Sequence, residues 1–282
     1  MSRLADAATS EAKGSVAGRI GAVVLRHVYL MQTSWPRVFE LMYWPTIQMI
    51  LWGFITQFFL QHSSYVAQAA GVLIAAVLLW DVLFRGQLGF SLSFLEEVWS
   101  RNLGNLAVSP LAPREFLAAL TVMSLIRTVI GVLPAAGLAI VFYEFNVFTL
   151  GLPLVAFFTL LLVFGWAIGM MVSALVLRVG QGAESVAWLA IFLLAPVSAV
   201  YYPIAVLPEW LQPVSWMLPT APVFEGMRAI LVDGTVRYDL LVHAALVDLA
   251  YLALGAFLFL YSFHVARKRG LLLQVEIGRA HV

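Results

Sequence analysis

The chain has 282 residues, of which 62% are hydrophobic and 11% are charged, and its mean hydropathy is +0.95. These values lie far from those of a soluble globular domain and indicate an integral membrane protein. The formal net charge of +1 gives no reason to expect nucleic-acid binding, and the absence of cysteine from the sequence excludes disulfides, thiolate metal sites and thiol catalysis.

The N-terminal region precedes the first long apolar run. Residues 1–15 contain no apolar core followed by a small-residue cleavage site, so we expect a disordered cytoplasmic terminus without a signal peptide. Residues 16–36 predict an amphipathic helix with Arg19 and Arg26 on a polar face. It is either a helix lying in the membrane interface or an ordinary juxtamembrane helix whose arginines snorkel, and both interpretations place it at the cytoplasmic surface. Pro36 ends it and turns the chain into the bilayer.

Runs of about 20 apolar residues mark membrane-spanning helices. The sequence has six such runs, at residues 38–60, 66–88, 114–143, 150–177, 184–206 and 240–264. Lys and Arg gather in the segments before the first run, after the second, after the fourth and after the last, whereas 61–65 and 144–149 contain neither. By the positive-inside rule, both termini are cytoplasmic. We therefore expect an all-α membrane protein with a six-span domain at 37–266 and a cytoplasmic tail at 267–282.

Four charged side chains fall within the expected spans, where each is costly unless it is paired or hydrated. Asp81 and Arg85 are four residues apart in the second span and can pair on one helix face. Arg127 and Asp248 lie at similar depth in the third and sixth spans, so we predict that they pair or share a polar cavity. These charges either fix the helix register or contact a substrate.

Small residues in the fourth span recur every four positions, at Gly165, Gly169 and Ser173. Such a stripe allows a neighbouring helix to approach closely. We expect this neighbour to belong to the same subunit rather than to a dimer partner.

The connection between the second and third spans combines apolar residues with Glu96, Glu97, Trp99 and Arg101. This pattern predicts a short helix within residues 93–103 that docks on another protein, or rests on lipid, and ends at Gly104. Pro113 is well placed in the first turn of the next helix.

Residues 195–231 contain six prolines within a strongly apolar stretch, so they cannot form one continuous helix. At membrane depth, such backbone must be shielded by protein or line a cavity, which makes this segment a candidate translocation path. Trp210 and Trp216 fit an interfacial aromatic belt, whereas Tyr201 and Tyr202 could serve the belt or a ligand.

No catalytic constellation emerges from the sequence. The five histidines are scattered without metal-site spacing, and the carboxylates form no obvious acid–base pair. The phosphate-binding pattern GxxxxGK[ST] is also absent, so any ATP hydrolysis must come from another chain.

Two segments resemble a known family. EVWSRNLGNLAVSPL, at residues 97–111, is similar to the acidic, glycine-containing signature between the second and third spans of type-2 ABC transporter permeases, which have the type V exporter fold. YYPIAVLPEWLQPVSWMLPTAPVFEGMRAIL, at residues 201–231, resembles the segment of that family between its fifth and sixth spans. The order and topology also agree, and the resemblance covers residues 16–270.

The resemblance implies a permease subunit without its own ATPase site or bound cofactor. It would form a homodimer, or pair with a similar subunit, and rest on ABC ATPase subunits that bind ATP and Mg²⁺. Residues 93–103 would be the coupling helix, with Glu96, Glu97, Trp99 and Arg101 transmitting motion. Residues 199–225 would form short re-entrant helices that cap the path, with Tyr201, Tyr202, Pro203, Pro208, Trp210 and Glu225.

The implied activity is export of an amphipathic, lipid-like or lipid-linked glycan substrate or a drug across a bacterial inner membrane. An ion-coupled secondary transporter is the alternative, because Arg127, Asp81 and Asp248 could serve ion coupling and the broken segment could bind substrate. Dependence on a partner ATPase separates the two.

Overall fold

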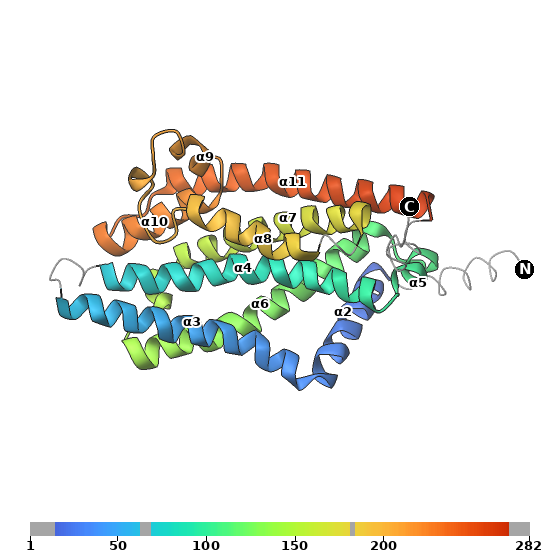
Figure 1. The fold of residues 1–282 in the computed structure, drawn as a ribbon, viewed down its shortest axis with the longest axis horizontal. Helices are drawn as coiled ribbons and strands as arrows, with labels where there is room; N and C mark the ends of the chain where they lie inside the picture. Colours follow the sequence, from blue (N-terminus) through green and yellow to red (C-terminus); the bar gives the residue numbers. More distant parts are fainter. Residues whose placement is uncertain (1–14, 63–68, 181–183, 271–282) are drawn as a thin grey trace, which may run out of the picture.

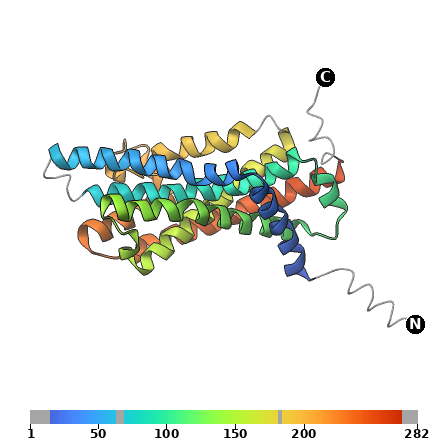
Figure 2. The same cartoon turned by 90° about the horizontal axis from the view of Figure 1, so that it is seen from below.

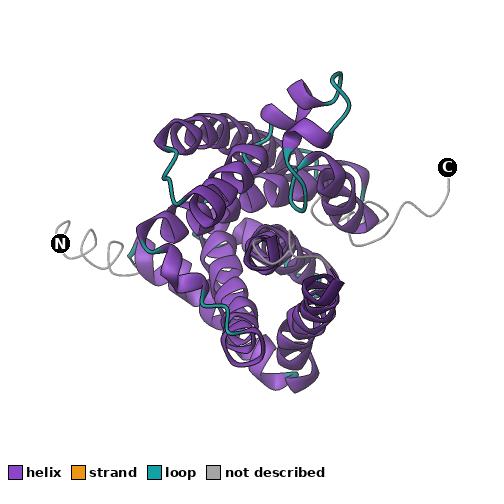
Figure 3. Cartoon of the chain, turned by 90° about the vertical axis from the view of Figure 1, so that its left-hand side faces the viewer, coloured by secondary structure: helices purple, strands orange, loops and turns teal. Residues whose placement is uncertain are grey.

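The computed structural model describes residues 15–62, 69–180 and 184–270, and this part of the chain folds into helices and connecting loops without a strand (Figure 3). The expected disordered terminus lies outside the described residues except for its last position, as does most of the expected tail. The helices, with 3-10 helices labelled η, are α2 Val16–Thr33, α3 Trp35–His62, α4 Ala69–Trp99, α5 Leu103–Val108, α6 Pro113–Tyr143, η1 Val147–Leu150, α7 Leu152–Val179, α8 Glu184–Leu194, η3 Ala195–Val197, η4 Ile204–Val206, α9 Gln212–Trp216, α10 Thr220–Asp233 and α11 Tyr238–Lys268.

The amphipathic helix is α2, and it is steeply inclined to α3 (Figures 1 and 2). It begins at Val16 because the hydroxyl of Ser15 accepts a hydrogen bond from the backbone N–H of Gly18, at 3.0 Å. The helix ends at Thr33, and Pro36 lies in the first turn of α3, where its missing N–H costs no helical hydrogen bond. The chain therefore changes direction just before Pro36, as the sequence predicts.

Five helices are long and apolar enough to cross a membrane: α3, α4, α6, α7 and α11. The limits expected from the sequence agree closely for α6 and α7, where prolines and glycines mark the ends. The second span is longer than expected, because α4 continues beyond residue 88 to Trp99. Its last turns carry several polar side chains that are buried against other helices rather than exposed in a loop.

The expected fifth span at 184–206 is wrong as a single helix. It is occupied by α8, an apolar helix of 11 residues, and by the short η3 and η4, which are separated by non-helical residues. Pro196 lies in η3, and the chain then turns through η4 and α9 into α10. The proline-rich stretch is thus broken as the sequence predicts, but the break comes earlier than expected.

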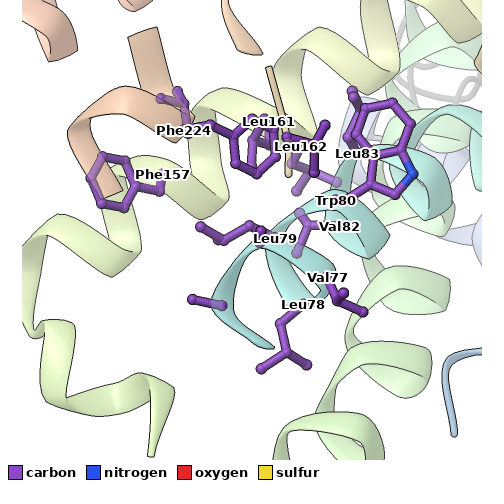
Figure 4. Close-up of a cluster of buried hydrophobic side chains, with 14 of the residues drawn as sticks. Val77, Leu78, Leu79, Trp80, Val82, Leu83, Phe157, Leu161, Leu162 and Phe224 are labelled. Carbon is purple, nitrogen blue, oxygen red and sulfur yellow. The ribbon is translucent and has the colours of Figure 1, made fainter. Parts of the chain in front are cut away.

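The core is built around α4 and α7, which pack along each other, while α11 covers the other side of α7. Figure 4 shows side chains of α4, α7 and α10 meeting in one hydrophobic cluster, including Leu79, Leu83, Phe157, Leu161 and Phe224. A second cluster at the other end joins α4, α6 and α11 through Phe90, Phe94, Phe116, Phe259 and Phe263. These two clusters fix α4 in place, and α4 carries Asp81, Arg85, Glu96 and Glu97.

The small residues of α7 account for its close packing. A Cβ at Gly165 would lie 2.8 Å from the carbonyl oxygen of Leu83, and one at Gly169 would lie 2.8 Å from Cβ of Phe90. Ser173, the third member of the stripe, is buried. The glycines therefore face α4 of the same subunit, which confirms the intrasubunit interpretation of this stripe.

Candidate transport path and coupling region

A cavity of about 640 Å³ opens between α3, α4, α6 and α8, beside the end of α2. Its wall combines aromatic rings with charged groups. The aromatic residues are Tyr43, Trp44, Phe84, Trp99 and Trp188, and the charged residues are Glu40, Arg85, Glu96 and Arg127. Such a mixed wall suits an amphipathic molecule, with its apolar part on the rings and its polar part near the charges.

Asp81 and Arg85 form the ion pair that their spacing predicts. Nε of Arg85 donates to Oδ2 of Asp81 at 2.6 Å, and both side chains are buried. The guanidinium lies against Gly131 of α6, where a Cβ would come within 2.5 Å of its Nη1. The absence of a side chain at Gly131 leaves room for the guanidinium between α4 and α6.

The predicted partnership of Arg127 with Asp248 is wrong. Nη2 of Arg127 donates instead to Oε2 of Glu96 at 2.7 Å. Among the described residues, neither carboxylate oxygen of Asp248 has a hydrogen-bond partner, and Asp248 does not line the cavity that Arg127 lines. The physical reason is that α6 packs mainly on α4 and α3, whereas α11 packs mainly on α7, so equal depth does not bring the two side chains together.

The expected helix at 93–103 is also corrected. Residues 93–99 are the last turns of α4, and the separate short helix is α5, which contains Gly104 instead of ending there. Arg101 lies in the turn between the two helices with φ of +55°, a left-handed conformation that terminates α4. Trp99 is 44% exposed and Arg101 is exposed, but Glu96 and Glu97 point into the protein.

Glu97 joins three segments at this end of the bundle. One carboxylate oxygen accepts a hydrogen bond from Nη1 of Arg26 in α2, and the other accepts one from Nδ2 of Asn102 at 2.6 Å. Nδ2 of Asn105 in α5 donates in turn to Oδ1 of Asn102 at 3.1 Å. Glu97 therefore connects α2 and α4 with the turn that leads into α5, from a buried position behind the surface.

A second ion pair attaches the beginning of α2 to α6. Arg19 donates from Nε and Nη2 to the carboxylate of Glu115, at 2.9 and 2.6 Å. The hydrogen bond to Glu115 raises the pKa of the Arg19 guanidinium above its ordinary value. The seven-residue spacing of Arg19 and Arg26 was visible in the sequence, but it indicates only a shared helix face and not these partners.

The cap residues expected from the sequence lie in the connection between α8 and α10. The Tyr201 ring stacks on Trp52 of α3 with centroids 4.6 Å apart, and the Tyr202 hydroxyl donates to the carbonyl of Pro196. Pro203 and Pro208 flank η4, and Trp210 is 74% exposed. Tyr201 thereby ties this connection to α3.

Glu225 and Arg228 of α10 hold the cap backbone. The Glu225 carboxylate accepts a hydrogen bond from the backbone N–H of Ile204 at 2.7 Å. Arg228 donates to the carbonyl oxygens of Ala199 and Val200, at 2.9 and 3.3 Å. These side chains satisfy backbone groups that the broken helix leaves unpaired, as a segment at membrane depth requires. The sequence analysis singled out Glu225 but missed the equivalent role of Arg228.

The helices are those of a multi-pass membrane protein, and its cavity lies beside the central helix α4. The family model described as ABC-2 type transporter matches residues 29–232, and the chain belongs to this family. It is thus a permease subunit of an ABC transporter, a class whose ATPase is a partner. A comparison of the chain with curated proteins gave no match. The family match gives no support to the ion-coupled alternative.

Proposed function

We propose that the chain is the permease subunit of an ATP-driven exporter, in which two permeases and two separate ATPase subunits work together. The observation that carries this proposal is the connected polar network at one end of the bundle. It joins α5, a short helix on which Asn105 and Val108 are exposed, to the wall of the cavity through α4. An ATPase that pushes on α5 would thereby move groups beside the transported molecule.

The docking element in this proposal is α5 with the preceding turn, in place of residues 93–103. Val108 at its end is 87% exposed, and Trp99 and Arg101, just before α5 in the sequence, are also exposed. Behind this surface, Glu97 contacts Asn102 and Arg26, and Glu96 contacts Arg127 on the cavity wall. Glu96 and Glu97 would then transmit motion without touching the ATPase.

The transport path in this proposal is the cavity, closed by a second copy of the chain. The helices α3 and α8 flank the opening and expose large apolar side chains, namely Trp35, Phe39, Tyr43, Trp44, Leu51, Phe54, Trp188, Leu189, Phe192 and Leu193. A second permease packed on these faces would turn the groove into an enclosed route. The broken segment between α8 and α10 would close its far end.

The orientation in this proposal follows the basic residues. Arg101, Arg114, Arg178 and Lys268 lie at the end of the bundle where α4, α7 and α11 finish and α6 begins. The positive-inside rule makes this the cytoplasmic side, in a bacterial inner membrane. The mixed aromatic and charged wall supports an amphipathic, lipid-like or lipid-linked glycan substrate or a drug.

Copurification of the tagged permease with its ATPase tests the docking element. We expect Val108→Asp to abolish association, because it places a charge on the exposed apolar end of α5 without touching the core. Phe148→Asp is the matched control, because Phe148 is also exposed but lies in η1 at the other end of the bundle. Equal association of both variants would contradict docking through α5.

A further inference from the structure

A second cavity, of about 340 Å³, lies between the ends of α7 and α11, and we call it the α7–α11 cavity. Its polar wall consists of Arg178 from α7 and of Tyr261, Ser262 and Arg269 from the end of α11, and the rest of its wall is apolar. Among the described residues, none that lines it is acidic, and none also lines the cavity beside α4. The α7–α11 cavity therefore presents two guanidinium groups without a carboxylate to neutralise them, which favours an anionic ligand.

Arg178 is held in position at this cavity. Its Nε donates a hydrogen bond to Oγ of the buried Ser262 at 2.9 Å, and its Cζ lies 5.4 Å from the centre of the Tyr261 ring. Within the described part of the chain, its two terminal nitrogens have no hydrogen-bond partner, and the exposed Arg269 forms no ion pair. A guanidinium with free terminal nitrogens can donate two parallel hydrogen bonds to the oxygens of one phosphate. Arg178 is thus oriented for a phosphate before one binds.

The surface that leads from the cavity toward the middle of α11 is apolar. One face of this helix carries a residue at every third or fourth position, at Leu254, Phe257, Tyr261, Val265 and Arg269. Leu254 and Phe257 are 48% and 63% exposed, and the rings of Phe257 and Tyr261 stack with centroids 5.9 Å apart. This face is therefore apolar along the membrane-spanning helix and positive where the helix ends.

This order of apolar and positive groups matches an anionic lipid better than it matches a soluble anion. A soluble anion would use the two arginines and leave the apolar face of α11 without a role. Basic pockets at the ends of membrane-spanning helices lie at the level of the lipid headgroups, where anionic lipids attract arginine and lysine. In Figure 1, α11 and α3 lie at opposite edges of the bundle. A second permease packed on α3 and α8 would therefore leave this face of α11 to the lipid.

We propose that the α7–α11 cavity binds one anionic phospholipid from the leaflet at that end of the bundle. Arg178 and Arg269 contact its phosphate, and an acyl chain lies along Leu254 and Phe257. Because each helix supplies one arginine, the lipid holds the last turns of α7 and α11 together. The inference goes beyond the proposed function, since this lipid is bound outside the transport path and its binding needs neither substrate nor ATPase.

Titration of the purified permease in detergent with phosphatidylglycerol, followed by native mass spectrometry, measures the binding of single lipids. A basic residue near an anionic lipid contributes about fivefold in affinity, so we expect the double variant Arg178→Gln, Arg269→Gln to bind phosphatidylglycerol about 25-fold more weakly. The double variant Arg267→Gln, Lys268→Gln is the matched control, because it removes the same charge from the end of α11 but neither residue lines the cavity. It should bind as tightly as the unaltered protein. Equal weakening in both double variants would show a diffuse attraction to the basic helix end and would overturn the proposal.

Two further measurements separate a lipid from a soluble anion. Phe257→Ser leaves the charge unchanged but removes the exposed ring, so it should weaken the binding of phosphatidylglycerol. Inorganic phosphate in large excess should not displace the bound lipid, because it lacks the acyl chain. Displacement by phosphate together with unchanged binding in Phe257→Ser would assign the cavity to a soluble anion. Equal binding of phosphatidylglycerol and phosphatidylcholine by the unaltered protein would also contradict the proposal, since only the first carries a net negative charge.

Thermal unfolding of each variant in detergent without lipid checks that it is folded, because Arg178 also contacts Ser262. If the double variant is destabilised, Arg269→Gln alone tests the site, since this exposed side chain forms no ion pair within the described residues. It should lose about fivefold in affinity for phosphatidylglycerol, and unchanged affinity would overturn the proposal. The permease alone is used throughout, so a failure to find an associated ATPase would contradict the proposed function and leave this result unaffected.

Discussion

Asp81 and Asp248 are both buried aspartates in long helices, with 4% and 2% of their surface exposed. Asp81 receives a hydrogen bond from Arg85, whereas the Asp248 carboxylate oxygens have no partner among the described residues. A buried polar group without a partner destabilises the folded state. Removing one member of a buried ion pair destabilises it more, because the other member is left as an unpaired buried charge. The two positions should therefore respond in opposite ways to the same substitution.

Replacing Asp248 with Leu should raise the free energy of unfolding by about 1 to 3 kcal/mol, because a carboxylate without a partner is exchanged for an apolar side chain of similar size. Asp81→Leu is the matched control and should lower it by about 3 kcal/mol, because Arg85 would remain buried and unpaired. Thermal and denaturant unfolding of the purified proteins in detergent measures both. A loss of stability in both variants would show that Asp248 has a stabilising partner in the folded protein.

The sequence predicts one of these two environments. Asp81 and Arg85 are on the same helix, so their spacing alone brings them together. The partner of Arg127 depends on which helices touch, and hydropathy gives only the depth of a residue along the membrane normal. Glu96 was assigned to a surface helix because the apolar run ends near residue 88, and this assignment excluded it as a partner.

At the scale of helices, α4 and α7 pack in close backbone contact. A Cβ at Gly165 would meet the carbonyl oxygen of Leu83 at 2.8 Å and the backbone nitrogen of Gln87 at 2.9 Å. These are main-chain atoms of a helix, so they cannot move aside as the end of a flexible side chain can. Any larger residue at this position must push the two helices apart.

Gly165→Ala should therefore lower the free energy of unfolding by about 1 to 3 kcal/mol, the usual cost of overpacking. Gly137→Ala is the matched control on α6, because a Cβ there meets no atom within 4 Å. It should stabilise the protein by about 0.5 to 1 kcal/mol, since alanine favours the helix over glycine. Unfolding of the two variants under identical conditions compares them, and equal stabilities would contradict the close contact of α4 with α7.

The sequence predicts a helix end where a residue such as proline marks it. It does not predict an end that depends on contacts with other helices. Pro113 fixes the beginning of α6, and Pro196 prevents a long fifth helix. No comparable residue ends α4 near residue 88, and its polar last turns are helical because α2 and α6 cover them and satisfy Glu96 and Glu97. The sequence therefore showed the break in the fifth span but not its place, and it could not show the extension of the second.

For the whole molecule, the number of crossings follows from where the long helices begin and end. The helices α7 and α11 run in the same direction (Figure 1), so the chain between Val179 and Tyr238 must return across the bundle. No single helix makes this return, because α8 has 11 residues and extends only roughly 16 Å, against about 30 Å of hydrocarbon. We therefore expect six crossings, of which the fifth combines α8 with the segments leading to α10.

Single introduced cysteines can test this topology, because the natural sequence contains none. Val179→Cys and Tyr238→Cys place a thiol at positions that are 65% and 71% exposed, at the two ends of the fifth crossing. A membrane-impermeant maleimide applied to intact cells should label Tyr238→Cys only, and labelling of Val179→Cys should require broken membranes. Phe148→Cys and Val108→Cys provide the outer and inner controls, since η1 and α5 lie at opposite ends of the bundle. If Val179→Cys and Tyr238→Cys were labelled from the same side, the segment between α7 and α11 would enter and leave on one face, and the chain would cross the membrane five times, with its termini on opposite sides.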